Sequence, residues 1–355
     1  MSTIGPIPPL GTGALAAAVT PASIAPIAAT PQVSGEAALL ALLDGSVGAT
    51  ISEALNTQDS LAPLLANLAT AGASPALSPA ARDTIAQILR VQTPLDASVT
   101  AETLASAVKA SGLFMEASLG AAIVSPGSPP PDLTGDLKAL LLQLTTQLAP
   151  AAAAEAAAVM AQPAPTRGSA RAPPPVRGGP LAGQGAVRAT LDAEADGPTL
   201  AHGLHQDARA ALGRLQLSQL ASLPEPDATT TRWAFEAPVA TPAGAAMAQF
   251  EISRDGGSPS SGGDAKSAPP VWRARFSLAV EPTGPVHAEV TLVEGRARVT
   301  LWVERDGARQ ILAADQTDLA DALTSEESPD VAVRVLSGAP APPAPQSGQL
   351  LDRRS

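Results

Sequence analysis

The chain has 355 residues, a net charge of −11, four Phe, three Trp and neither Tyr nor Cys. Without cysteine, disulfide bonds, thiolate chemistry and cysteine-ligated metal ions are excluded. An acidic chain is also a poor general nucleic-acid binder, because neutralising phosphates requires Lys and Arg.

The first segment, residues 1–34, is rich in Pro, Ala, Thr and Ser. Its six prolines remove backbone donors and clash with a preceding helical turn, so we expect a disordered segment. No Lys or Arg precedes Arg82, whereas a secretory signal needs a positive start and a longer apolar run. We therefore expect no cleaved signal peptide. We also expect no stable membrane insertion, because no apolar run approaches the roughly 18 residues of a span.

Helical periodicity dominates residues 35–160, which are rich in Ala and Leu. Ser78 followed by Pro79 is typical of a helix start, and Thr100 is a candidate cap for the next helix. That next helix would place four apolar side chains on one face, namely Leu104, Val108, Met115 and Leu119. The strongest pattern predicts a helix over 132–148 with one apolar stripe, formed by Leu133, Leu137, Leu140, Leu141, Leu144 and Leu148.

Residues 161–197 return to Pro, Gly, Ala and Arg without an apolar period, which predicts a flexible, partly polyproline linker. A helix is expected next, over 199–223. Two short strands are then predicted at 232–237 and 246–253, carrying Trp233, Phe235 and Phe250. The chain ends in a Pro-rich tail that we expect to be disordered.

Strict alternation of apolar and polar residues predicts three strands between 272 and 304. The two-residue turn Glu294-Gly295 pairs Val293 with Arg296 and aligns two apolar rows, Val286, Ala288, Val290 and Leu292 opposite Val303, Leu301, Val299 and Ala297. A five-residue loop, 281–285, would pair Val280 with Val286 and bring Phe276 beside Val290. One helix over 309–323 is expected to cover this face, and a last strand at 331–336 completes an α+β domain. The expected fold is therefore an antiparallel meander sheet packed on a helix, preceded by an Ala/Leu-rich helical, partly disordered N-terminal half.

The other face of the meander carries basic side chains around a tryptophan. The candidate partner-binding residues are Trp302, Arg273, Arg275, Arg296, Arg298 and His287. Trp and Arg are enriched at binding hot spots, which favours a docking surface for an acidic partner. In the alternative interpretation, Trp233, Phe235 or Phe250 of the earlier strands packs over Trp302, and the arginines are solvated.

Catalytic motifs are not evident. His202 and His205 lie one helical turn apart, but a metal site needs a third ligand and a supporting shell. Nucleophile-elbow, phosphate-loop and zinc-protease patterns are missing from the sequence. We predict a protein that is not an enzyme and that uses no cofactor or metal.

The C-terminal pattern resembles the flagellar hook-length control protein family of bacteria. The shared features are a glycine leading into two alternating strands, followed by an arginine and spaced leucines on a helix. Here these are Gly284, Val286, Val290, Leu292, Val299, Leu301, Arg309, Leu312, Leu319 and Leu323. Residues 111–119 and 136–144 resemble two further segments of long family members.

The resemblance implies a non-catalytic protein that sets hook length. Such a protein is made in the bacterial cytoplasm and exported through the flagellar type III apparatus by its uncleaved N-terminus. Its N-terminal part is a molecular ruler that contacts hook and hook-cap subunits. Its C-terminal domain contacts the cytoplasmic domain of the export-gate switch protein and triggers the change from hook-type to filament-type substrates.

We expect a monomer with five parts: a disordered export segment at 1–34, a helical ruler-like region at 35–160, a flexible linker at 161–197, a C-terminal α+β domain at 198–337, and a disordered tail at 338–355. The competing interpretation is a generic secreted or scaffold protein with a C-terminal β interaction module and no flagellar role.

Overall fold

The computed structural model describes residues 48–96, 99–124, 131–159, 172–224, 230–256, 269–324 and 330–341. The predictions for residues 1–34, for 161–171 of the linker and for the tail beyond 341 lie outside the described residues.

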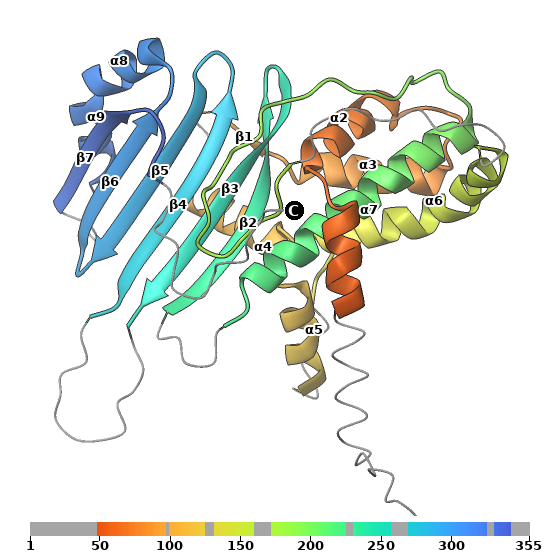
Figure 1. Cartoon of the computed structure of the whole chain (residues 1–355), viewed down its shortest axis with the longest axis horizontal. Coiled ribbons are helices and arrows are strands. Elements are labelled where there is room, and N and C mark those ends of the chain that lie inside the picture. Colours follow the sequence, from red (N-terminus) through yellow and green to blue (C-terminus); the bar gives the residue numbers. More distant parts are fainter. Residues whose placement is uncertain are drawn as a thin grey trace, which may run out of the picture. The chain divides into compact units, whose positions relative to one another are not determined.

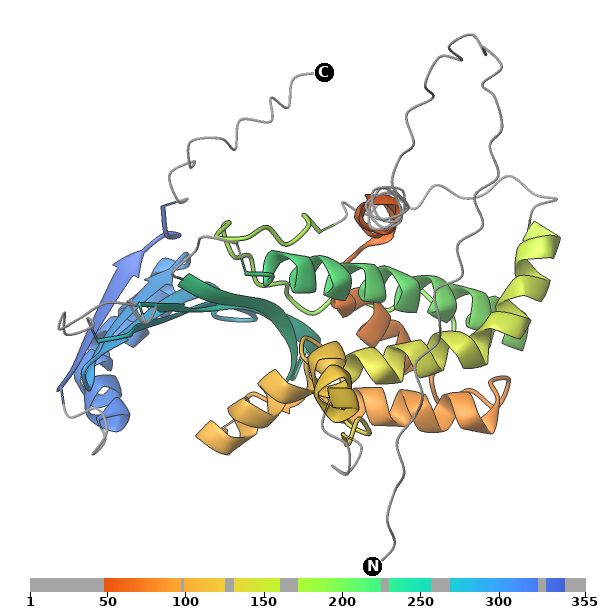
Figure 2. The same ribbon diagram turned by 90° about the horizontal axis from the view of Figure 1, so that it is seen from below.

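Four helices share one aliphatic core: α2 (Leu61–Ala71), α3 (Pro79–Arg90), α6 (Leu137–Val159) and α7 (Gly197–Ala221). A further helical stretch covers 48–57. Ser78 caps α3 by accepting the Ala81 N–H, as predicted, and Asp196 caps α7 in the same way. Figure 2 shows α6 and α7 lying side by side. Their apolar stripes meet, so Leu137, Leu141 and Leu144 of α6 and Leu200 and Leu204 of α7 are fully buried.

The helix predicted from Thr100 is two helices, α4 (Ala101–Ala110) and α5 (Met115–Val124), so the predicted common face is wrong. Thr100 does cap α4. The chain turns at Gly112, whose φ of +85° and close approach to the Lys138 backbone suit only glycine. Of the four side chains expected on one face, only Met115 is buried.

Helix α6 begins at Leu137, not at residue 132, because Asp136 accepts the Ala139 N–H and sets the helix start there. It continues to Val159, past Pro150. Among the described helices, none is long and apolar enough by itself to cross a membrane, although α4 and α5 pass that test as a bent pair.

One seven-stranded sheet forms the second layer, in the order β1 to β7 along the chain (Figure 1). Its strands are β1 (Thr93–Pro94), β2 (Thr230–Thr241), β3 (Gly244–Asp255), β4 (Val271–Val280), β5 (Gly284–Val293), β6 (Arg296–Val303) and β7 (Asp330–Ser337). Strands β2 to β6 are antiparallel neighbours, whereas β1 and β7 pair in parallel with β2 and β6. The predicted last strand is confirmed, and the two short strands are full members of the same sheet.

The β5–β6 register is confirmed at every predicted pair, from Val293 opposite Arg296 to Val286 opposite Val303. Glu294 and Gly295 have φ values of 48° and 77°, as a primed two-residue turn requires. The predicted β4–β5 register is wrong by two residues, because Val280 pairs with Gly284 and the turn has three residues. A two-residue shift leaves every side chain on its predicted face.

The apolar face of the sheet is covered at one end by two short helices, not by the single helix predicted. These are α8 (Asp306–Ala314) and α9 (Gln316–Leu323), which lie against β7 in Figure 1. Leu319 and Ala320 pack against a small core formed by Ala288, Val299, Leu301 and Val333. Leu312 is half-buried and Leu323 is exposed, so Leu319 is the family-pattern leucine that closes this core.

Candidate docking surfaces on the polar face of the sheet

The polar face of the sheet is divided between two environments. Over β2, β3 and β4 it is crossed by residues 172–187, which we call the strap. Toward β7 it presents what we call the outer patch, formed by Arg273 of β4 and by Arg296, Arg298, Trp302, Arg334 and Leu336 of β6 and β7. The strap belongs to the predicted linker, residues 161–197, and it is hydrogen-bonded to the sheet.

The residues of the outer patch lie on β4, β6 and β7. Trp302 on β6 pairs with Leu336 on β7 and is half-buried. Arg298, also on β6, is exposed, and its neighbour Arg296 keeps 78% of its side chain exposed while reaching Asp330 at 3.8 Å. On β4, Arg273 lies 3.7 Å from Asp255 and 3.9 Å from Glu289, with its side chain 41% exposed. Long, exposed ion pairs of this kind contribute little, so these guanidinium groups remain able to bind another chain.

Two of the six predicted residues make internal contacts instead. Arg275 donates to Glu251 Oε1 at 2.6 Å and to the Gly179 carbonyl of the strap at 3.4 Å. His287 is 7% exposed, and its Nε2 lies 3.0 Å from Glu304 Oε1. The structure therefore separates Arg275 and His287 from the four exposed or half-buried members of the predicted set.

The alternative in which earlier strands cover Trp302 is wrong. Phe250 pairs with Phe276, which pairs with Ala288, and these side chains lie on the apolar face. Trp233 stacks on Trp272 at 6.3 Å, and Phe235 stacks on Phe250 at 5.1 Å, both on that same face. The early strands extend the sheet sideways, so their aromatic rings lie on the side opposite Trp302.

Sequence reasoning missed Arg334 and Leu336 as members of the patch. The final strand was predicted, but its partner and its register were not. Parallel pairing of β7 with β6 places Arg334 beside Thr300 and Leu336 beside Trp302. The helix expected before the last strand was the available signal. Strands that pair in parallel need a long crossover connection, which is usually helical.

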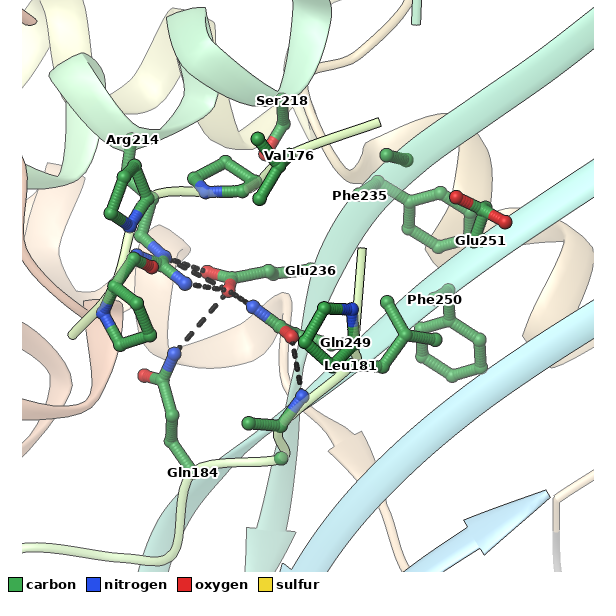
Figure 3. A pocket seen from close by; sticks show the side chains of 17 residues that line it. Val176, Leu181, Gln184, Arg214, Ser218, Phe235, Glu236, Gln249, Phe250 and Glu251 are labelled. Atoms are coloured by element: carbon green, nitrogen blue, oxygen red, sulfur yellow. Dashed lines mark hydrogen bonds and ion pairs between the residues drawn. The ribbon is translucent and has the colours of Figure 1, made fainter. Parts of the chain in front are cut away.

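Beneath the strap lies a buried ion pair between α7 and β2 (Figure 3). Arg214 donates from Nε and Nη2 to the Glu236 carboxylate at 2.7 to 2.9 Å, and from Nη1 to the Gln58 side chain and the Pro173 carbonyl. Glu236 also accepts from Gln249 at 2.7 Å. Both ionic side chains are at most 3% exposed. Saturated hydrogen bonding of this kind is what makes a buried pair tolerable.

The glycine of the family pattern has a structural reason. Gly284 has a φ of +77°, and a Cβ there would lie 2.5 Å from the Arg305 side chain. Arg305 forms a two-pronged pair with Glu281 at 2.6 Å and donates to the Pro282 carbonyl. Hydrogen bonding from Arg305 lowers the pKa of Glu281. Gly284 thus lets the β4–β5 turn close against the end of β6.

Comparison with protein families gives a match over residues 261–343 to the family described as "Flagellar hook-length control protein FliK". Comparison with curated proteins and with solved structures gives no match. The matched range begins before β4 and ends after β7, so it contains the meander, α8, α9 and the whole outer patch.

Proposed function

From the premise that residues 261–343 are a domain of the flagellar hook-length control family, we propose that this protein controls hook length as an exported, non-catalytic ruler and switch. The observation that carries the proposal is the match itself, because it includes the described strands and helices from β4 to β7. The expected family positions from Gly284 to Leu323 all lie inside it.

The ruler role is assigned to the part of the chain before β2. Residues 1–230 would span roughly 350 Å as a continuous helix and about 760 Å when fully extended. Reaching such lengths requires the described helices to leave the sheet. No disulfide bond opposes that unfolding, because the chain contains no cysteine. Along this extended part we propose contacts with hook and hook-cap subunits during export through the type III apparatus.

The switch role is assigned to the outer patch. We expect it to dock an acidic segment of the cytoplasmic domain of the export-gate switch protein. Arginine pairs with carboxylates in a two-pronged geometry, so Arg273, Arg298 and Arg334 suit such a segment. Trp302 and Leu336 supply the apolar anchor that interface centres usually contain.

Hook length in a strain lacking this protein tests the proposed function. We expect long, uncontrolled hooks without filaments in electron micrographs of purified hook structures. The full chain should restore normal hooks, and a chain lacking residues 232–355 should not. Hooks of normal length bearing filaments in the deletion strain would exclude a role in hook-length control.

Binding measurements test the docking surface separately. Arg298→Glu should weaken binding of the switch protein's cytoplasmic domain about tenfold or more, since reversing a charge at an interface adds repulsion. Arg188→Glu is the matched control, because Arg188 is also exposed but lies outside the outer patch. Equal effects of the two variants would show that net charge, and not this surface, governs binding.

A further inference from the structure

The strap meets the sheet through its main chain. Three of its backbone N–H groups donate to side chains on the polar face: Gly178 to Glu251 Oε2 at 2.9 Å, Ala182 to Gln249 Oε1 at 2.8 Å, and Gly183 to Ser277 Oγ at 2.7 Å. Gln184 and Met247 then exchange two backbone hydrogen bonds, as neighbouring antiparallel strands do. The strap therefore lies on the sheet as a peptide that turns at residues 176–179 and whose backbone is recognised by β3 and β4.

At this contact, the side chains of the sheet are buried and the residues of the strap are not. The polar side chains under the strap are almost completely buried, namely Glu236, Gln249, Glu251 and Ser277. No residue of the strap itself is buried. If the strap leaves, these polar groups become hydrated, which compensates in part for the hydrogen bonds that are lost.

A cavity also lies under the strap. It measures about 140 Å³ and is lined by the proline run 173–175, by Leu181 and by the Arg214–Glu236 pair (Figure 3). Side chains that face a void lose the dispersion contacts of a close-packed interior. The strap is thus fixed by directional hydrogen bonds and one close backbone approach, and not by tight packing.

That close approach occurs at Gly183. A Cβ at this position would lie 2.5 Å from Leu278 Cα and 2.6 Å from Leu278 N, both backbone atoms that cannot turn aside. By contrast, a Cβ at Gly185 would lie 3.7 Å from the nearest atom, the Ala279 carbonyl oxygen, which is an ordinary contact. The close backbone contact therefore requires glycine at position 183 of the bound peptide and tolerates a side chain two residues later.

We propose that the polar face of β2, β3 and β4 is a peptide-binding site that the strap occupies in cis. Its ligand is a segment with small side chains, free backbone N–H groups and a glycine at the position of Gly183. The strap is an internal occupant that competes with such a segment of a partner protein. The site is distinct from the outer patch and does not depend on the flagellar role.

The test uses a fluorescently labelled synthetic peptide of residues 172–187 and the full-length chain. Gly183→Ala should displace the strap, and Gly185→Ala is the matched control. We expect Gly183→Ala to bind the labelled peptide about tenfold or more tightly than the wild type and Gly185→Ala do. The reason is that apparent affinity rises with the fraction of open sites. The same peptide carrying Ala in place of Gly183 should not bind. Hydrogen exchange should show the amides of Gly178, Ala182 and Gly183 losing protection in Gly183→Ala alone.

Two results would overturn the proposal. One is loss of strap protection in Gly183→Ala without any gain in peptide binding, because an open site would then not accept a peptide. The other is unchanged strap protection, because the strap would then not depend on the close approach at Gly183. If Gly183→Ala fails to fold, Ala182→Pro serves instead. It removes the N–H that Gln249 accepts and leaves the sheet unaltered, and it should produce the same gain in binding.

Discussion

The two faces of the sheet across β2, β3 and β4 differ in the side chains they carry and in how deeply those side chains are buried. The apolar face carries five of the seven aromatic residues of the chain, namely Trp233, Phe235, Phe250, Trp272 and Phe276. Trp272 is nevertheless 39% exposed, and Trp233, Phe250 and Phe276 are only half-buried. The polar face is the better buried one, with Glu236, Glu251 and Ser277 at 2%, 4% and 0% exposure. Burial here follows which elements pack over a face, and not its hydropathy.

Different interactions stabilise the two faces. On the apolar face, aromatic rings contact one another along the sheet: Phe235 stacks on Phe250 at 5.1 Å, and Phe250 meets Phe276 at 5.7 Å in a tilted arrangement. On the polar face, helix α7 and the strap close over ionised groups whose hydrogen bonds are saturated. A saturated buried pair tends to specify one arrangement more than it stabilises it. We infer that the polar contacts fix where α7 docks.

Breaking the buried pair should have the largest effect. Arg214→Met leaves the Glu236 carboxylate buried without its main partner, and we expect a loss of about 3–5 kcal/mol in the free energy of unfolding. Urea denaturation followed by circular dichroism measures it. The control is Arg209→Met, which removes an exposed pair with Glu53 and should cost at most about 1 kcal/mol. Similar losses for both variants would contradict the special role of the buried pair.

On the apolar face, truncating Phe235 should lower the free energy of unfolding more than truncating Trp272. Phe235 is 4% exposed, so Phe235→Ala should cost about 3 kcal/mol by removing buried surface and leaving a cavity. Trp272→Ala removes a larger ring that is already partly hydrated, together with an Arg254 contact at 5.5 Å, and should cost only about 1–2 kcal/mol. The same urea titration ranks them, and the reverse order would mean that the aromatic face is covered in solution.

The turn that joins β4 to β5 depends on the glycine that follows it. Gly284→Ala places a side chain at a φ of +77° and against Arg305, so we expect a loss of about 1–2 kcal/mol. Gly307→Ala is a suitable control, because nothing lies within 4 Å of a Cβ built there. Thermal unfolding of both variants measures the difference, and a harmless Gly284→Ala would show that the turn tolerates another conformation.

The smallest effect should come from a buried carboxylate outside the sheet. Burial raises the pKa of Asp136, so the folded state holds its proton more tightly than the unfolded state does. Stability then falls as pH rises from the usual carboxyl pKa of about 4 through the raised value, and stays lower above it. Asp136→Asn removes this loss and can still cap α6. Its stability relative to the wild type should rise across that window, and a pH-independent difference would contradict the assignment.

Local patterns predicted the elements better than the contacts between them. The alternation and the Glu294-Gly295 turn were enough to predict the β5–β6 register, because turn length and face agree there. The β4–β5 register failed because the choice between a three-residue and a five-residue turn leaves the faces unchanged. Likewise the break between α4 and α5 depends on the approach of Gly112 to Lys138, which is distant in sequence.

The candidate site shows the same limit. Trp302, Arg273, Arg296 and Arg298 were found from strand alternation alone, because face membership is a local property. The strap site and the Arg214 network join residues far apart, such as Arg214 to Gln58 and Gly183 to Ser277. No periodicity marks such partners, and the proline-rich composition of the strap predicted a linker without contacts.

The most direct test of the central claim is hook length in a strain whose only copy carries Arg298→Glu together with Trp302→Ala. Electron microscopy of purified hooks gives the length distribution, and circular dichroism of the purified variant confirms its fold. If the outer patch drives the switch, hooks should be long and lack filaments, as in the deletion strain. Hooks of wild-type length bearing filaments would contradict the assignment of the switch to this surface.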